Sequence, residues 1–138
     1  MILLDTSGLL SAIDASQRHH AACVEALSTA SPPLLLSPFV LAELDYLLAT
    51  QVNTHAELAL VDEIARGAYR LEPFNAQDVA AAAEIIRRYS NLAIGLADAS
   101  IVVIAQRHGV RDVLTLDERH FRALRAGGKR LRLLPADR

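Results

Sequence analysis

The stretch MILLDTS at residues 1–7 decides the fold, because an apolar run ends there in an acidic residue that two helix-capping residues follow. The apolar run predicts a short strand over residues 1–4, and Thr6 and Ser7 can cap a helix over residues 8–14. A second stretch, VLTLD at residues 113–117, repeats an apolar strand with an acidic residue after it. Two predicted strands therefore each end in a carboxylate.

Outward from these stretches, short apolar runs alternate with longer helical patterns. Ser37 and Pro38 mark the start of one helix, and Gly67 and Gly109 mark the ends of two others. We expect strands over residues 1–4, 34–36, 68–71, 113–116 and 131–134. We expect helices over residues 8–14 and 16–29, from 38 to about 50, from 53 or 54 to 66, from 75 or 76 to 89, and over 96–108 and 118–126.

Short strands separated by helices predict an α/β fold, in which helices cover both faces of a parallel sheet. The chain has 138 residues, of which 52% are hydrophobic, so a single domain over residues 1–138 can fill a core. In sheets of this kind, ligands bind beyond the carboxyl ends of the strands. The residues that follow the predicted strands are therefore the first candidates for a functional site.

Composition excludes several classes of protein. Cys23 is the single cysteine, so no internal disulfide can form, and the N-terminus lacks the charged segment and cleavage site of a signal peptide. The longest apolar run, residues 92–105, contains Asp98 and is too short to cross a bilayer. We expect a cytoplasmic protein without a membrane-spanning segment.

The net charge of -2 hides an uneven distribution of charge along the chain. Residues 107–138 contain nine Arg or Lys against four Asp or Glu, a balance of +5, so the remaining residues carry -7. We call residues 107–138 the basic segment. Two interpretations fit it: a surface that binds phosphates, or a solvated face whose charges stabilise helix C-termini.

Four acidic residues occupy positions that solvation alone does not explain. Asp5 and Asp117 directly follow apolar strands, so both should lie at the carboxyl edge of the sheet. Glu43 and Asp98 have apolar neighbours three and four residues away, so we expect both on apolar helix faces. A carboxylate that faces a core is unfavourable unless it is paired, hydrogen-bonded or bound to a metal.

Three of these carboxylates also have a purely structural explanation. Asp5 or Asp117, taken alone, is better explained as a helix cap, and Asp98 in a first helical turn would interact favourably with the helix dipole. Glu43 lies too far into its helix to be a cap and would need a buried cationic partner. Asp45 points to nearly the opposite side of the same helix, and we interpret it as structural or solvated.

Together the four carboxylates favour a metal site. Carboxylates gathered at one rim raise one another's pKa values unless a cation lies between them. Oxygen ligands select Mg²⁺ or Mn²⁺ over zinc, and the five histidines show no HExxH or Cys/His spacing. We therefore predict a catalytic, metal-binding set that consists of Asp5, Glu43, Asp98 and Asp117.

The motifs around these residues resemble those of PIN-domain ribonucleases and, within that family, VapC-type toxins of bacterial toxin–antitoxin pairs. The resemblance covers nearly the whole chain. It rests on the order and spacing of ILLDTS at residues 2–7, the helix from Ser37 and Pro38 to Glu43, GLADA at residues 95–99 and LTLDERHF at residues 114–121. It implies a PIN-like three-layer α/β/α sandwich with a short-stranded parallel sheet.

The resemblance also implies a mechanism and partners. Asp5 and Asp98 match the principal metal ligands, Glu43 and Asp117 match the acids that complete the site, and Thr115 matches a hydroxyl position beside it. The implied activity is endonucleolytic hydrolysis of structured RNA, such as tRNA or ribosomal RNA, by water that Mg²⁺ or Mn²⁺ activates. The implied partners are an antitoxin protein and a second copy of the chain in a homodimer.

The residues also bear on three other functions. A haloacid-dehalogenase-like phosphatase needs a second aspartate two residues after the first, where this chain has Ser7. A receiver domain needs a lysine at a late strand end, but Lys129 precedes the last predicted strand. A non-catalytic PIN-like module that binds RNA or protein is the remaining alternative, and the complete set of acidic positions favours the nuclease.

Overall fold

The MILLDTS stretch contains the central strand of a parallel sheet in the computed structural model, which describes residues 1–138. The five strands of this sheet, in spatial order, are β3 (Arg70–Leu71), β2 (Leu34–Leu36), β1 (Ile2–Leu4), β4 (Asp112–Leu114) and β7 (Arg132–Leu134). Each strand runs parallel to its neighbours, and Leu3 of β1 is paired with Leu35 on one side and Val113 on the other. The predicted α/β fold with a short-stranded parallel sheet is confirmed.

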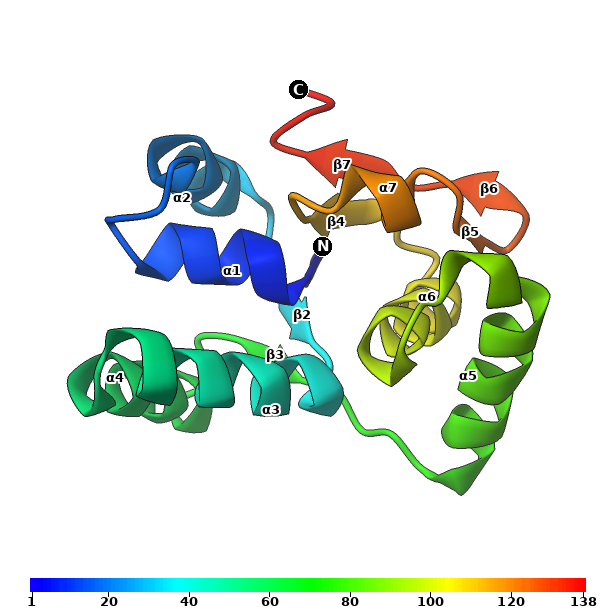
Figure 1. Cartoon of the computed structure of the whole chain (residues 1–138), viewed down its shortest axis with the longest axis horizontal. Coiled ribbons are helices and arrows are strands. Elements are labelled where there is room, and N and C mark those ends of the chain that lie inside the picture. The colour runs from blue at the N-terminus through cyan, green and yellow to red at the C-terminus, as the bar shows by residue number, and fades with distance from the viewer.

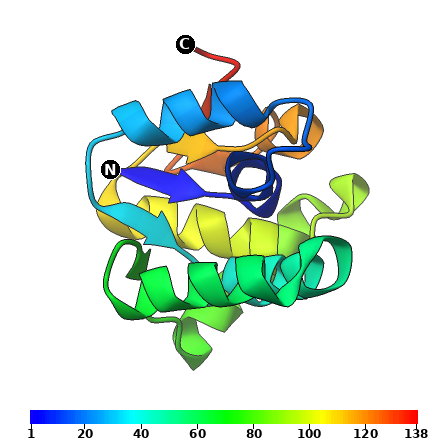
Figure 2. The same ribbon diagram turned by 90° about the vertical axis from the view of Figure 1, so that its left-hand side faces the viewer.

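Helices cover both faces of this sheet. They are α1 (Thr6–Ile13), α2 (His20–Thr29), α3 (Pro38–Leu47), α4 (Thr54–Ala65), α5 (Ala76–Arg88), α6 (Leu96–His108) and α7 (Glu118–Phe121), with a π-helical turn η1 (Leu48–Val52) and a 3-10 turn η2 (Ser90–Leu92). Figure 1 shows α1 to α4 on one side of the sheet and α5 and α6 on the other. In Figure 2, α2 and α4 lie in front of the strands and α6 lies behind them.

Right-handed crossovers explain this division of the helices. From β1 to β2 to β3 the chain moves toward one edge of the sheet, so the connecting helices α1 to α4 cover one face. From β3 the chain crosses back to β4 and then to β7, so α5 and α6 cover the opposite face. The three-layer arrangement therefore follows from the strand order. None of the helices is long and apolar enough to cross a membrane.

The core lies against both faces of the sheet and joins 30 buried hydrophobic residues in one cluster. Helix α6 contributes a continuous buried run from Ala99 to Ala105, which explains why its sequence lacks an amphipathic pattern. Gly8 allows the first turn of α1 to approach β4 closely, because a Cβ there would lie 2.5 Å from the carbonyl oxygen of Leu114. This approach sets how closely α1 packs against the end of β4.

Three predicted helices have wrong boundaries. The helix expected over residues 8–14 begins at Thr6, so Thr6 and Ser7 lie in its first turn and do not cap it; Asp5 holds the N-cap position, but its side chain makes no capping hydrogen bond. The helix expected over residues 118–126 ends at Phe121, and β5 (Arg125–Ala126) pairs with antiparallel β6 (Lys129–Arg130). Gly127 and Gly128 have φ values of 57° and 77°, so they form a hairpin turn instead of ending a helix. The helix expected over residues 16–29 begins at His20, because the Asp14 side chain accepts hydrogen bonds from residues 16 and 17 and stabilises a turn there.

Candidate functional site

The carboxyl ends of β1 and β4 form the crevice that holds the candidate site. The strand order reverses its direction between these neighbouring strands, and such a point in a parallel α/β sheet leaves room for a ligand. The pocket there measures about 450 Å³. Asp5 follows β1, Asp117 follows β4, and both line the pocket together with Glu43 of α3 and Asp98 of α6. The structure therefore brings together all four acidic residues that the sequence singled out.

Asp5 is the most deeply placed of these acids, with 6% of its surface exposed. Ser7 and Thr115 donate hydrogen bonds to Asp5 Oδ2 over 2.8 and 2.7 Å. The same two hydroxyl oxygens accept hydrogen bonds from the backbone N–H groups of Leu116 and Asp117, each over 3.0 Å. Burial raises the pKa of Asp5, and the hydroxyl hydrogen bonds oppose that rise. The network fixes the orientation of this carboxylate and ties the ends of β1 and β4 together.

Asp98 lies in the first turn of α6, where 19% of its side chain is exposed. Burial, followed by the negative charge of Asp5, raises the pKa of Asp98 from 3.8 to about 6, and His120 opposes this rise. No Arg or Lys forms an ion pair with Asp5, Glu43, Asp98 or Asp117. The negative charge gathered in the pocket therefore has no Arg or Lys partner, and His120 is the basic side chain that lies beside it.

Glu43 lies on the rim of the pocket and is exposed, so the expectation that it faces the core is wrong. Val40 and Leu44 are fully buried and define the inner face of α3, whereas Tyr46 is 66% exposed. The apolar residues around Glu43 thus belong to more than one face of the helix. Because water solvates its carboxylate, Glu43 needs no buried cationic partner.

A buried pair of hydroxyl groups fixes α3 against α6. Ser37 caps α3 by accepting a hydrogen bond from the backbone N–H of Phe39 over 3.2 Å. Its hydroxyl lies 2.6 Å from that of Ser100, and both serines are fully buried. This contact sets the position of Glu43 relative to Asp98.

Asp45 lies outside the pocket, in agreement with its structural interpretation. Its carboxyl group lies against Glu57 of α4, and a hydrogen bond between the two raises the pKa of Glu57. The helix therefore directs Glu43 to the pocket and Asp45 to the neighbouring helix.

Asp117 combines the structural and the functional interpretation. Its Oδ1 atom accepts a hydrogen bond of 3.1 Å from the backbone N–H of His120, so Asp117 caps α7. Its Oδ2 atom lies 2.9 Å from His120 Nδ1, on the pocket side. Capping thus uses one carboxylate oxygen and leaves the other for a ligand.

His120 is a pocket residue that the sequence analysis missed. Its Nδ1 atom lies 2.9 Å from Asp117 Oδ2 and 3.4 Å from Asp98 Oδ2. Ligand atoms of these three residues lie within 4.8 Å of one another, so the group could hold a metal ion. The available signal was the spacing of three residues between an N-cap aspartate and a histidine, which places both in one helical turn.

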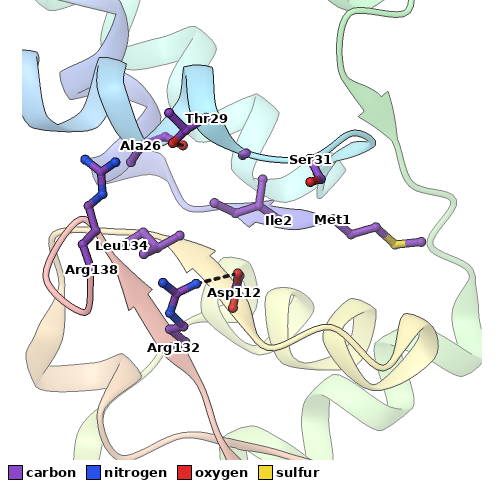
Figure 3. A pocket seen from close by; sticks show the side chains of 10 residues that line it. Met1, Ile2, Ala26, Thr29, Ser31, Asp112, Arg132, Leu134 and Arg138 are labelled. Carbon is purple, nitrogen blue, oxygen red and sulfur yellow. Dashed lines mark hydrogen bonds and ion pairs between the residues drawn. The ribbon is translucent and has the colours of Figure 1, made fainter.

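A second pocket, of about 320 Å³, lies at the opposite edge of the sheet (Figure 3). Its carboxylate, Asp112, accepts a hydrogen bond of 3.1 Å from Arg132, and its other basic residue, Arg138, is paired with Glu25. The charged side chains of this pocket are thus paired within the chain, unlike the four carboxylates at the carboxyl edge, which have no Arg or Lys partner.

Comparisons with known proteins agree with this geometry. The family model of the PIN domain matches residues 2–126. The chain is 46% identical over 135 residues to ribonuclease VapC26 of Mycobacterium tuberculosis (strain ATCC 25618 / H37Rv), in a match that covers 97% of this chain and 100% of that protein.

Two solved structures with 21% sequence identity share the fold. One is Mycobacterium tuberculosis VapC20, described as a sarcin–ricin loop cleaving toxin, with a TM-score of 0.79 over 85% of this chain and 90% of that one. The other is DNA-bound VapBC from Salmonella typhimurium, with a TM-score of 0.69 over 96% of each chain. The chain therefore belongs to the PIN-domain family and, within it, to the VapC ribonucleases.

Proposed function

We propose that this chain is a metal-dependent endoribonuclease that cleaves structured RNA, tRNA or ribosomal RNA, as the toxin of a toxin–antitoxin pair, with residues 1–138 acting as a single PIN domain. The observation that carries the proposal is the convergence of four carboxylates from different parts of the chain in one pocket, where none of them forms an ion pair with an Arg or Lys. The 46% identical relative is named a ribonuclease, which supports the same chemistry here.

The donor atoms of the pocket fit a hard divalent cation. Asp5 and Asp98 are the proposed principal ligands of Mg²⁺ or Mn²⁺, and Asp117 is placed to complete the site. The raised pKa values of Asp5 and Asp98 reflect burial and negative charge that a cation would relieve. When bound, the ion would lower the pKa of a water molecule and neutralise charge that develops on the phosphate.

The side chains around the site have separate tasks. Ser7 and Thr115 hold Asp5 Oδ2, so that this carboxylate meets its ligand in a fixed orientation. Glu43 is exposed on the rim, where it can accept a proton from the attacking water. The contact between Ser37 and Ser100 holds the helix of Glu43 in register with the rest of the site.

The contacts of the basic segment narrow the choice of RNA-binding residues. Arg122 is paired with Glu118 and Asp137, and Arg132 is paired with Asp112. Arg119 is exposed on α7, next to His120, and forms no ion pair within the chain. We assign phosphate binding near the site to Arg119, and structural ion pairing to several other arginines.

The proposed partners are a cognate antitoxin and a second copy of the chain. The similar structure from Salmonella typhimurium is a VapBC complex, which supports an antitoxin partner here. Tyr46 of α3 and Leu58 of α4 are 66% and 54% exposed, and exposed apolar side chains of this kind are available for protein contacts.

RNA cleavage by purified protein tests the proposal. Asp5→Asn and Asp98→Asn should abolish cleavage while the far-ultraviolet circular dichroism spectrum stays that of the wild type, and excess EDTA should stop the wild-type enzyme. Asp45→Asn is the matched control, because Asp45 lies on α3 but outside the pocket. Undiminished cleavage in EDTA or by Asp5→Asn would reject the metal mechanism. RNA binding without cleavage on any structured RNA would favour the non-catalytic module.

A further inference from the structure

We propose that His120 is a direct nitrogen ligand of the metal ion, through Nδ1, beside Asp98 and Asp117. This inference rests on the proposed function, since it concerns the ion that the acidic residues hold. It changes the site from an oxygen-only set, which the sequence predicts, to a mixed set with one imidazole.

The three candidate ligand atoms have the spacing of neighbouring positions around one ion. In an octahedral site with bonds of about 2.0–2.1 Å, adjacent ligand atoms lie roughly 2.9 Å apart, the bond length multiplied by the square root of two. His120 Nδ1 lies 2.9 Å from Asp117 Oδ2 and 3.4 Å from Asp98 Oδ2. Small side-chain rotations bring such a set onto one ion.

The bonding direction of His120 Nδ1 is unused within the protein. The atom is buried from solvent, yet it makes no hydrogen bond. The contact of 2.9 Å between this atom and Asp117 Oδ2 does not have the geometry of a hydrogen bond. A buried polar atom without a partner is unfavourable, and a cation on this side of the ring would satisfy it.

The local fold holds the imidazole in this position. The backbone N–H of His120 donates a hydrogen bond to Asp117 Oδ1, which fixes the first turn of α7. The next residue, Phe121, is fully buried and anchors the turn to the core. The same turn therefore supplies one carboxylate oxygen and one imidazole nitrogen to the pocket.

A nitrogen ligand changes the preference of the site among divalent ions. Carboxylate oxygens suit Mg²⁺ and Mn²⁺ alike, whereas imidazole favours transition metals over Mg²⁺. We therefore expect Mn²⁺ to bind more tightly than Mg²⁺. Loss of the imidazole should weaken Mn²⁺ binding on the order of tenfold or more, and Mg²⁺ binding by less.

Electron spin echo envelope modulation of bound Mn²⁺ tests the ligand directly, because it detects coupling to a ligating ¹⁴N nucleus. EDTA-stripped protein is loaded with Mn²⁺ as wild type, His120→Asn and His55→Asn. The asparagine keeps a small oxygen donor near the place of Nδ1, and His55 is an exposed histidine on α4 outside the pocket. We expect ¹⁴N coupling in the wild type and in His55→Asn, and its loss in His120→Asn.

A nitrogen-free spectrum of wild-type protein with bound Mn²⁺, or coupling that persists in His120→Asn, would overturn the assignment. Neither result would contradict the proposed metal-dependent nuclease activity, provided that EDTA abolishes RNA cleavage. Wild-type protein that cleaves RNA but binds no Mn²⁺ or Mg²⁺ in equilibrium dialysis would overturn both proposals. If His120→Asn does not fold, His120→Gln is measured in its place. The wild-type spectrum alone still distinguishes a site with a nitrogen ligand from a site with oxygen ligands only.

Discussion

Replacing Asp98 by asparagine should stabilise the metal-free protein against unfolding. Its pKa is raised from 3.8 to about 6, chiefly by burial and then by the charge of Asp5, so at neutral pH the folded state contains an unfavourable carboxylate that asparagine removes. The difference between these pKa values, at 1.36 kcal/mol per pKa unit, corresponds to about 3 kcal/mol. Because water reaches part of the side chain, we reduce the expected gain to about 1–2 kcal/mol.

The gain should depend on pH in a defined direction. A carboxyl group whose pKa is higher in the folded state stabilises the fold below its unfolded pKa, and this contribution is lost as the pH rises through the folded pKa. In EDTA, wild-type protein should therefore lose stability between about pH 4 and pH 6 relative to Asp98→Asn. Above pH 7 the difference in free energy of unfolding should be constant.

Thermal unfolding in EDTA at a series of pH values measures this difference. For a domain of this size, a gain of 1–2 kcal/mol raises the melting temperature by about 3–7 °C. Added Mn²⁺ should raise the melting temperature of wild type more than that of Asp98→Asn, because the variant lacks a proposed ligand. Asp112→Asn is the control, since Asp112 is paired with Arg132 and should gain nothing. An Asp98→Asn protein no more stable than wild type at pH 7 in EDTA would refute the charge-crowding argument.

Three further substitutions test other features. Thr6→Val should change the free energy of unfolding by less than about 1 kcal/mol, because the buried Thr6 hydroxyl has no hydrogen-bond partner; a larger loss in urea titration would contradict that lack of a partner. Gly8→Ala should cost about 1–3 kcal/mol in the same titration and slow RNA cleavage, because its Cβ would press against the Leu114 carbonyl and displace α1. Arg119→Ala should weaken RNA binding in EDTA and should lower the salt dependence of that binding by roughly one counterion. Arg111 precedes β4, at the amino end of the strand, so Arg111→Ala should change neither the affinity nor its salt dependence. Equal effects of the two substitutions would contradict the placement of RNA at the carboxyl edge.

Local patterns were sufficient to predict the five strands of the parallel sheet and the acids that follow two of them. An apolar run ending in Asp5 or Asp117 needs no long-range information, and parallel strands bring their carboxyl ends to one edge of the sheet. The gathering of these acids with Asp98 then follows from the order of strands and helices. Their pocket is the part of the site that sequence reasoning predicted well.

The remaining differences depend on contacts between distant segments. The ring of His120 meets Asp98 because α7 turns over the start of α6, which no local spacing encodes. Glu43 is exposed because α3 lies at the rim of the pocket, although its neighbours are apolar. A Gly–Gly pair is compatible with the end of a helix and also with the turn of a hairpin. The sequence therefore could not distinguish these two roles of Gly127 and Gly128, which only the pairing of β5 with β6 reveals.

The central position of β1 has a consequence for biosynthesis. This strand precedes all others in the chain, yet Asp5 reaches its hydroxyl partner Thr115 and the neighbouring Asp117 only after β4 has paired beside it. A nascent chain that has not yet passed residue 120 lacks part of the pocket, however much of it has already folded. We therefore expect nuclease activity to appear only after the segment with Asp117 and His120 has been translated and β4 has paired with β1.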